Sequence, residues 1–253
     1  LPEEVDVGFG LVKRGNEPAQ RTVDTGYSER FAEARRVLFE AVNIPLLHRW
    51  RRPAMTVRAV RREDLDAMAG LFNRANGERL FASHVDGDWL EREMAKPGLD
   101  RQRWYVVERH GRLVGMAAAW DQHAFHRTRV LRYASVGVAL RAVYEAGRRV
   151  LRNAAPLPVE GSSFRSITLS RVAIENADPA VLRALLAAIA RDHVGRGYHM
   201  MHVGFAGDDP LHAATRGMVC QRFRSQVIVM VRRDRPECSG WYEGNPYVDL
   251  AMI

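Results

Sequence analysis

Two carboxylates stand at the ends of predicted strands, where a side chain can reach a bound substrate. Asp121 follows Trp120 at the end of one apolar run, and Glu175 follows Ile174 at the end of another. A carboxylate in such a place can act as a general base that takes a proton from the substrate. Each also has a simpler interpretation, Glu175 as a solvated turn residue and Asp121 as part of an ordinary strand exit. The stretch 120–125 (Trp-Asp-Gln-His-Ala-Phe) could likewise line a substrate pocket or be only that exit.

Histidines and cysteines form no recognisable metal or thiol site in the sequence. His199 and His202 fall in a predicted strand, where an offset of three residues directs them to opposite faces. Cys220 and Cys238 form no CxxC pair, which favours a reducing compartment, so we expect a cytoplasmic protein without a metal. A GxSxG elbow is absent, which argues against a serine hydrolase.

The charge of the chain comes almost entirely from arginine. The sequence has 253 residues, 47% of them hydrophobic and 27% charged, with a formal net charge of +8 and only two lysines, Lys13 and Lys96. Arginine favours anionic partners, but a GC-rich genome also enriches it. The arginines are scattered rather than gathered on one element, so we do not expect nucleic acid as a partner. No apolar run approaches about 18 residues and no secretory signal is visible, so no membrane association is expected.

The hydrophobic pattern predicts an α/β fold with a mixed, mostly antiparallel central sheet and helices on both faces. We expect residues 1–54 to form an N-terminal extension, which either packs on the main domain or is the remnant of an upstream unit, and residues 233–253 to form a C-terminal tail. The extension is expected to hold a strand over 5–12, a helix over 28–41 capped by Ser28, and a linker over 49–53. Strands are predicted near 56–60, 104–108, 113–120, 166–174, 199–205 and 223–231, and helices near 63–76, 88–95, 178–194 and 209–218.

Between the third and fourth strands of the main domain, 55–232, lies an insertion over 125–162. It carries an amphipathic helix over 135–152, with Val138, Val143, Val150 and Leu151 available for burial. We expect this helix to pack against residues 28–47, so that neither segment leaves an apolar stripe in water.

The order of elements in the main domain, with several of its motifs, resembles the GCN5-related N-acetyltransferase (GNAT) superfamily. The motifs are Val57-Arg58-Ala59-Val60 before Glu63-Asp64-Leu65, the pair Trp104–Glu108 and Gly111–Gly115, and Gly195-Arg196-Gly197-Tyr198 before a strand. The resemblance covers about residues 55–232. It implies an acyl-CoA-dependent N-acyltransferase that uses acetyl-CoA or another acyl-CoA and a small-molecule or peptide amine.

By the same resemblance, the acyl-CoA would lie along Val172, Ala173 and Ile174. Its pyrophosphate would meet the following loop and helix start at Asn176, Ala177, Asp178 and Ala180, and Glu175 and Asp121 are the candidate bases.

The sequence departs from the family pattern at two places. No glycine lies between Gly161 and Gly195, where the family has a glycine-containing loop, and Pro179 has no N–H to offer a phosphate. No tyrosine occurs between Tyr198 and Tyr242, where the family often places its acid. A catalytically inactive binding or scaffolding module with the same fold is therefore the alternative hypothesis.

Overall fold

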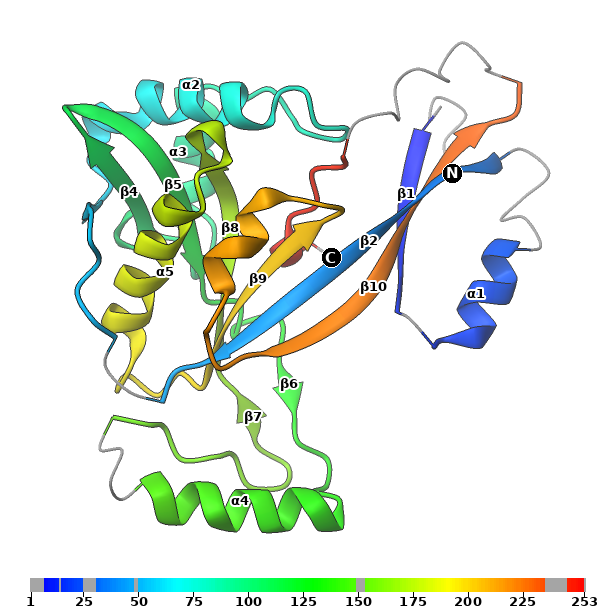
Figure 1. The fold of residues 1–253 in the computed structure, drawn as a ribbon, viewed down its shortest axis with the longest axis vertical. Coiled ribbons are helices and arrows are strands. Elements are labelled where there is room, and N and C mark those ends of the chain that lie inside the picture. The colour runs from blue at the N-terminus through cyan, green and yellow to red at the C-terminus, as the bar shows by residue number, and fades with distance from the viewer. Residues whose placement is uncertain are drawn as a thin grey trace.

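An eight-stranded sheet forms the centre of the fold and positions the cavities described below (Figure 1). The computed structural model describes residues 7–13, 15–24, 31–47, 50–148, 153–234 and 245–252. The strand order is β1-β10-β2-β9-β8-β5-β4-β3, and every neighbouring pair is antiparallel except β8 and β9. The strands are β1 (Val7–Lys13), β2 (Phe31–Pro45), β3 (Thr56–Ala59), β4 (Trp104–Arg109), β5 (Arg112–Trp120), β8 (Ser166–Ile174), β9 (Met200–Ala206) and β10 (Gln221–Arg232).

Helices cover both faces of this sheet, as the sequence predicts. On one face α5 (Pro179–His193) packs Leu182, Leu185 and Ile189 against the strands. On the other face α2 (Leu65–Asn76) and α3 (Gly87–Met94) bury Met68, Phe72 and similar side chains. The remaining elements are α1 (Glu17–Asp24), α4 (Ser135–Arg148), the small pair β6 (Thr128–Arg129) and β7 (Ser163–Phe164), and the 3₁₀ helices η1 (Arg62–Asp64), η2 (Arg101–Arg103), η3 (Glu175–Ala177), η4 (Pro210–Thr215) and η6 (Leu250–Met252).

Two short stretches of sequence account for a turn and for a helix start. The β4–β5 hairpin turns through His110 and Gly111, whose φ angles are 51° and 74°, and glycine adopts such values at no steric cost. Helix α5 begins with Pro179 at its first turn, and Asp178 caps it by accepting a hydrogen bond from the backbone N–H of Ala180.

The helix predicted over 28–41 is wrong, because most of that segment forms strand β2. The spacing of its apolar residues fits both the helical period and the alternation of a strand, and pairing with neighbouring strands decides for the strand. Leu38 is 45% exposed while Phe39 is 1% exposed, which is the alternation of a strand. β2 pairs with β10 from Phe31 to Asn43 and with β9 from Phe39 to Pro45, so its backbone groups are satisfied on both edges where the two ranges overlap. Ser28, the expected cap, lies outside the described residues.

The segment 1–54 supplies two strands of the central sheet. The strand predicted over 5–12 is β1, which pairs with β10 from Val7 to Lys13, and residues 5 and 6 lie outside the described part. The division of the chain at residues 54 and 232 remains a prediction.

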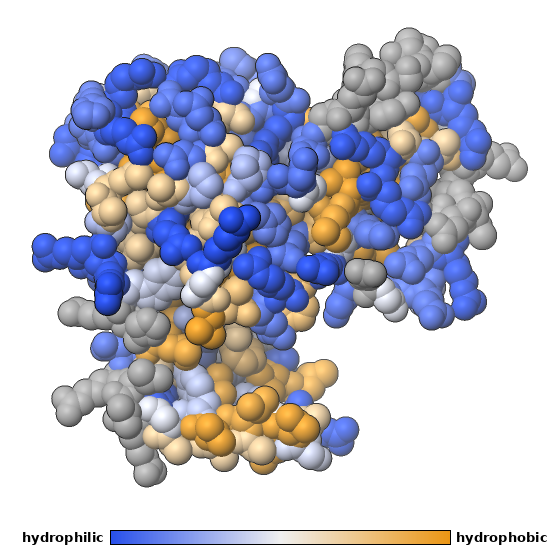
Figure 2. Space-filling view, viewed as in Figure 1, coloured by the Kyte–Doolittle hydropathy of each residue, from blue (hydrophilic) through white to orange (hydrophobic). Residues whose placement is uncertain are grey.

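Helix α4 lies within the range 135–152 predicted for a helix in the insertion, but it does not pack as expected. None of its described residues is buried, and Val138 and Val143 are 56% and 70% exposed. Figure 2 shows the resulting apolar surface over α4 at the bottom of the view. The packing predicted between this helix and residues 28–47 is therefore wrong, because β2 buries its apolar residues within the sheet instead. Val150 and Leu151 lie outside the described residues.

The assignment of β2 as a strand can be tested with two adjacent substitutions. Phe39→Ala is expected to lower the free energy of unfolding by about 3–5 kcal/mol, since it empties a fully buried site. Leu38→Ala is expected to cost less than about 1 kcal/mol, because this side chain faces solvent. Denaturant unfolding of the two variants measures both values. Similar losses for both would contradict the strand.

Candidate functional site

Strands β8 and β9 are parallel neighbours that separate after a short stretch. They pair only from Ser166–Met200 to Thr168–His202. Just beyond, Arg171 and Val172 both lie opposite Ala117 of β5, and Arg171 has a φ of 52°, so β8 carries a β-bulge. A bulge bends and twists its strand. The bulge therefore accounts for the divergence of β8 from β9.

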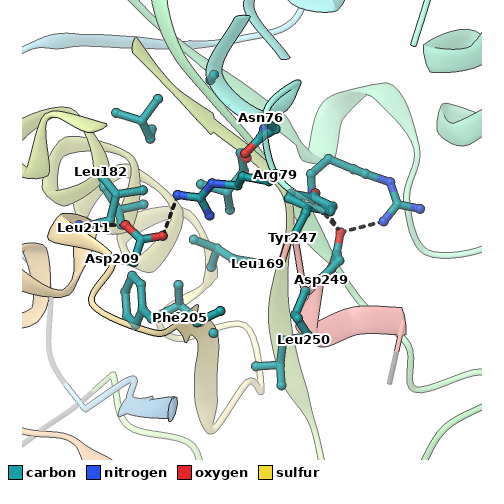
Figure 3. Close-up of a pocket in the computed structure, with 18 of the residues that line it drawn as sticks. Asn76, Arg79, Leu169, Leu182, Phe205, Asp209, Leu211, Tyr247, Asp249 and Leu250 are labelled. Carbon is teal, nitrogen blue, oxygen red and sulfur yellow. Dashed lines mark hydrogen bonds and ion pairs between the residues drawn. The ribbon is translucent and has the colours of Figure 1, made fainter. Parts of the chain in front are cut away.

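A cleft opens between the separated strands and contains a cavity of about 60 Å³ (Figure 3). Leu169, Leu182 and Phe205 form much of its apolar wall. Arg79 reaches across it to Asp209, with 2.8 Å between Nη2 and Oδ2, and Asp209 also caps η4 through the backbone N–H of Leu211. The cleft therefore has an apolar wall crossed by the Arg79–Asp209 ion pair.

Arg171 anchors the C-terminal segment to the cleft. Its guanidinium donates to Glu93 at 2.5 Å and to Asp249 at 2.6 Å, and its backbone N–H donates to the same Asp249 carboxylate at 2.9 Å. Ser170 Oγ donates to Asp249 at 2.7 Å. Burial lowers the pKa of Arg171, but the carboxylates of Asp249 and Glu93 outweigh it and leave the pKa raised, so the group stays charged.

Tyr247 brings a phenol to the cleft that sequence reasoning missed. The family resemblance places a tyrosine just beyond the fifth strand, whereas Tyr247 comes from the segment after β10 and lines the cavity. Burial, and then the charge of Asp249, raise the pKa of its hydroxyl well above the usual value. The hydroxyl donates to Asp249 at 3.4 Å. It is therefore a protonated donor at neutral pH.

The predicted cofactor strand has two residues on the cleft and one away from it. Val172 and Ile174 line the cavity, whereas Ala173 is packed on the α2 side of the sheet. The backbone carbonyl of Val172 accepts a hydrogen bond from Asn76 Nδ2 at 3.2 Å. Asp249 likewise accepts from the backbone N–H of Arg171. These two contacts supply hydrogen-bond partners to the backbone of β8 where β9 no longer pairs with it.

The loop after β8 is tied to the β4–β5 hairpin rather than open to an anion. Glu175 Oε1 lies 3.2 Å from Arg112 Nη2, and Asp178 Oδ2 lies 3.3 Å from Arg109 Nη2. Asp178 also accepts hydrogen bonds from the backbone N–H groups of Ala180 and Val181. With proline at the first position, the first turn of α5 has no open N–H among these residues.

Within the same loop, Asn176 and Ala177 adopt φ angles of 53° and 49°. Ala177 lines the cleft.

Asp121 is buried in a network of its own at the other end of β8. Its carboxylate accepts from Tyr198 at 2.7 Å and from Arg165 Nη2 at 2.9 Å. Burial raises its pKa, but these hydrogen bonds and that from the N–H of His123 outweigh the burial, and the pKa is lowered. Trp120 pairs with Thr168, at the start of β8, whereas Glu175 follows its end. The two candidate bases therefore do not meet.

A larger cavity, of about 700 Å³, lies beside α5 and is walled by residues 45, 47 and 50–55 and by residues 217–219. Ala180, Ala184 and Ala187 form its helical wall, and Trp50 and Met218 add apolar surface. Three arginines line it, Arg51, Arg52 and Arg183, and no acidic residue does among the described part of the chain. Its charge suits an anionic ligand with an apolar body. Of the predicted cofactor residues, Ala180 lies here.

The described residues hold no cluster of three or more histidine, cysteine, aspartate or glutamate side chains suited to a metal ion. Among them, no helix is long and apolar enough to cross a membrane.

Comparison with known proteins assigns the fold. No family model matches the sequence, and no curated protein matches it. A GCN5-related N-acetyltransferase from Sphaerobacter thermophilus is similar in structure, with 13% identity and a TM-score of 0.53, and the match covers 97% of this chain and 62% of that one. N-myristoyltransferase from Saccharomyces cerevisiae with bound myristoyl-CoA is similar with 12% identity and a TM-score of 0.50, over 80% of this chain and 49% of that one.

The chain thus spans less than two thirds of the length of these two structures. The likeness establishes that the chain has the GNAT fold, shared by N-acetyltransferases and N-myristoyltransferases, as the sequence resemblance predicted.

The network of Asp121 predicts a pH-dependent contribution to stability. Since its folded pKa is lowered, its stabilisation is present above the unfolded value of about 3.9 and is lost as pH falls through the folded pKa. Asp121→Asn is expected to cost about 1–3 kcal/mol at pH 7, and the difference from wild type should shrink below about pH 4.

Asp100→Asn serves as the matched control, because that carboxylate also pairs with an arginine but is 61% exposed. It is expected to cost less than about 1 kcal/mol at pH 7. Thermal unfolding over pH 3–8 measures both variants, and a constant deficit for Asp121→Asn would contradict this account.

Proposed function

We propose that this protein transfers an acyl group from an acyl-CoA thioester to an amine. The observation that carries the proposal is the cleft that the bulge opens between the parallel strands β8 and β9. An extended thioester arm can lie between two strands that have separated from each other. Solved structures with the same GNAT fold are acyltransferases, which supports acyl transfer at this cleft.

The reaction needs little from the protein beyond positioning and one proton donor. The lone pair of the amine nitrogen attacks the thioester carbonyl and forms the C–N bond, while the C–S bond breaks and leaves its electron pair on sulfur. One proton leaves the nitrogen for water, one proton passes from the Tyr247 hydroxyl to the sulfur, and water returns a proton to Tyr247, so that an amide and free CoA result. Tyr247, protonated and lining the cleft, is the proposed donor to the developing charge.

In this proposal the anionic part of CoA binds to side chains rather than to the start of α5. The N–H groups of Ala180 and Val181 are already used by Asp178, as described above. The large cavity beside α5 instead offers Arg51, Arg52 and Arg183, which can pair with phosphate oxygens. Ala177, on the cleft, and Ala180, on this cavity, would lie along the path between thioester and phosphates. Asn176 and Asp178 belong to the same loop and would flank that path.

The size of the cleft favours a short acyl group. About 60 Å³ is the space of a few water molecules, which suits an acetyl group rather than a long chain. Acetyl-CoA is therefore the proposed donor.

The alternative of a binding module without catalysis is favoured by one observation. Glu175 and Asp121, the candidate bases, are each held in ion pairs with arginines. Under that alternative acetyl-CoA would bind but no amide would form.

Two sets of variants test the proposal. Arg183→Met is expected to weaken acetyl-CoA binding about 10-fold in calorimetry, since a charged hydrogen bond contributes about 1.5–3 kcal/mol. Arg196→Met, an exposed arginine outside the cavity, should leave binding unchanged. Tyr247→Phe should lower kcat for release of free CoA about 10-fold with unchanged acetyl-CoA affinity, because it removes only the hydroxyl.

Absence of acetyl-CoA binding at millimolar concentration would overturn the proposal. Tight binding without CoA release, across a broad panel of amines, would establish the alternative.

A further inference from the structure

We propose that the acceptor is an amine that also carries a carboxylate, such as an amino acid, and that it binds in a pocket on the face of the sheet opposite α5. This inference rests on the proposed acyl transfer and names its second substrate. The pocket, called here the sheet-face pocket, has a volume of about 450 Å³, within the range of small-molecule sites. It is formed by side chains from β1, β2, β8, β9 and β10 and by the residues that follow β5.

The sheet-face pocket lies next to the cleft, on the side from which a nucleophile would approach. Thr168 and His202 line it, and they are the last pair before β8 and β9 separate. The residues on either side of His202, Met201 and Val203, pack with α5, so His202 faces the opposite side of the sheet. Leu250 of the C-terminal segment lines both the cleft and the pocket. Leu250 is therefore a shared wall of the cleft and the pocket.

The charge of the lining selects the class of acceptor. Lys13 of β1 lines the pocket, together with His123 and His126 from the segment after β5. No aspartate or glutamate lines it among the described residues. A polyamine or other purely cationic substrate would find no countercharge there, whereas a carboxylate can pair with the Lys13 ammonium. The pocket thus suits an amine with an anionic group.

His202 offers the amine a hydrogen-bond acceptor. Asn43 Oδ1 lies 2.7 Å from His202 Nδ1, and since a carbonyl oxygen only accepts, the proton is on Nδ1 and Nε2 has a free lone pair. Nε2 has no hydrogen-bond partner among the described residues, and burial lowers the pKa of the imidazole to about 4. The ring is therefore neutral at pH 7 and can accept from an N–H of the bound amine.

Binding of the acceptor can be measured without any acyl-CoA. Calorimetry would test the twenty standard amino acids and, for each that binds, the amine that lacks only its carboxylate. At least one amino acid is expected to bind, and its decarboxylated amine at least 10-fold more weakly. Lys13→Met should weaken the amino acid about 10-fold and the amine less than twofold, while Lys13→Arg, which keeps the charge, should retain binding.

A further variant, His202→Phe, is expected to weaken the amino acid and its amine equally. Thermal unfolding identifies any variant that fails to fold.

Failure of every amino acid to bind, or equal binding of amino acid and amine, would overturn this inference. An unchanged affinity in Lys13→Met would do the same. Acetyl-CoA binding is measured in parallel on wild type and Lys13→Met, and the two should be equal. If acetyl-CoA binds and no amino acid does, the acceptor assignment fails while the proposed acyl transfer stands. If an amino acid binds and acetyl-CoA does not, the proposed acyl transfer fails while the amino-acid site stands.

Discussion

The buried guanidinium of Arg171 joins three parts of the chain that are distant in sequence. It binds Glu93 of α3 and Asp249 of the C-terminal segment from a bulge in the middle of β8. A buried charge is costly unless it is paired, so the position of each partner is constrained by the other two. The bulge aims the side chain at its partners and also bends β8 away from β9. One residue thus couples the opening of the cleft to the placement of Tyr247 and Leu250 on its wall.

Two cavities that differ in chemistry lie on opposite faces of the sheet. On the α5 side the large cavity presents three arginines over apolar walls. On the other side the sheet-face pocket presents one lysine, three imidazoles and several hydroxyls. A reaction between two substrates needs both to reach one point without competing for the same surface. In the proposed reaction, access from opposite faces would satisfy that requirement, and Leu250 of the C-terminal segment lines both the cleft and the sheet-face pocket.

The sequence was sufficient for the elements of the main domain because their signals are local. Asp178-Pro179 marked the start of α5, and His110-Gly111 marked the hairpin turn. The assignment failed for β2, where Phe31, Leu38, Phe39 and Val42 fit either period and only pairing with β9 and β10 decided. The burial expected for α4 failed for a related reason, since an amphipathic pattern does not specify the surface that covers it.

The candidate site was harder to predict because its parts have no fixed spacing. The neighbouring positions of β8 and β9 followed from the order of elements. Tyr247 and Asp249 did not, since they follow a stretch with no periodic pattern and meet Arg171 only in three dimensions. A signal was nevertheless present: Arg171 is a charged residue inside a strand that otherwise holds only apolar and hydroxyl side chains, and such a residue requires a buried partner. Lys13, Asn43 and His202 come from three separate strands, so no motif could have joined them.

The position of β2 also affects how the chain reaches its folded state. β2 lies inside the sheet between two strands that come from the last third of the chain, and Arg36 and Gln226, which bond across β2 and β10, are 190 residues apart. Contacts over such distances require closure of long loops before they contribute, which slows folding. As the chain leaves the ribosome, β2 emerges long before either neighbour and has both edges unpaired. This apolar strand must remain free of other partners until more than 150 further residues have been made, so synthesis itself exposes the protein to aggregation for a long interval.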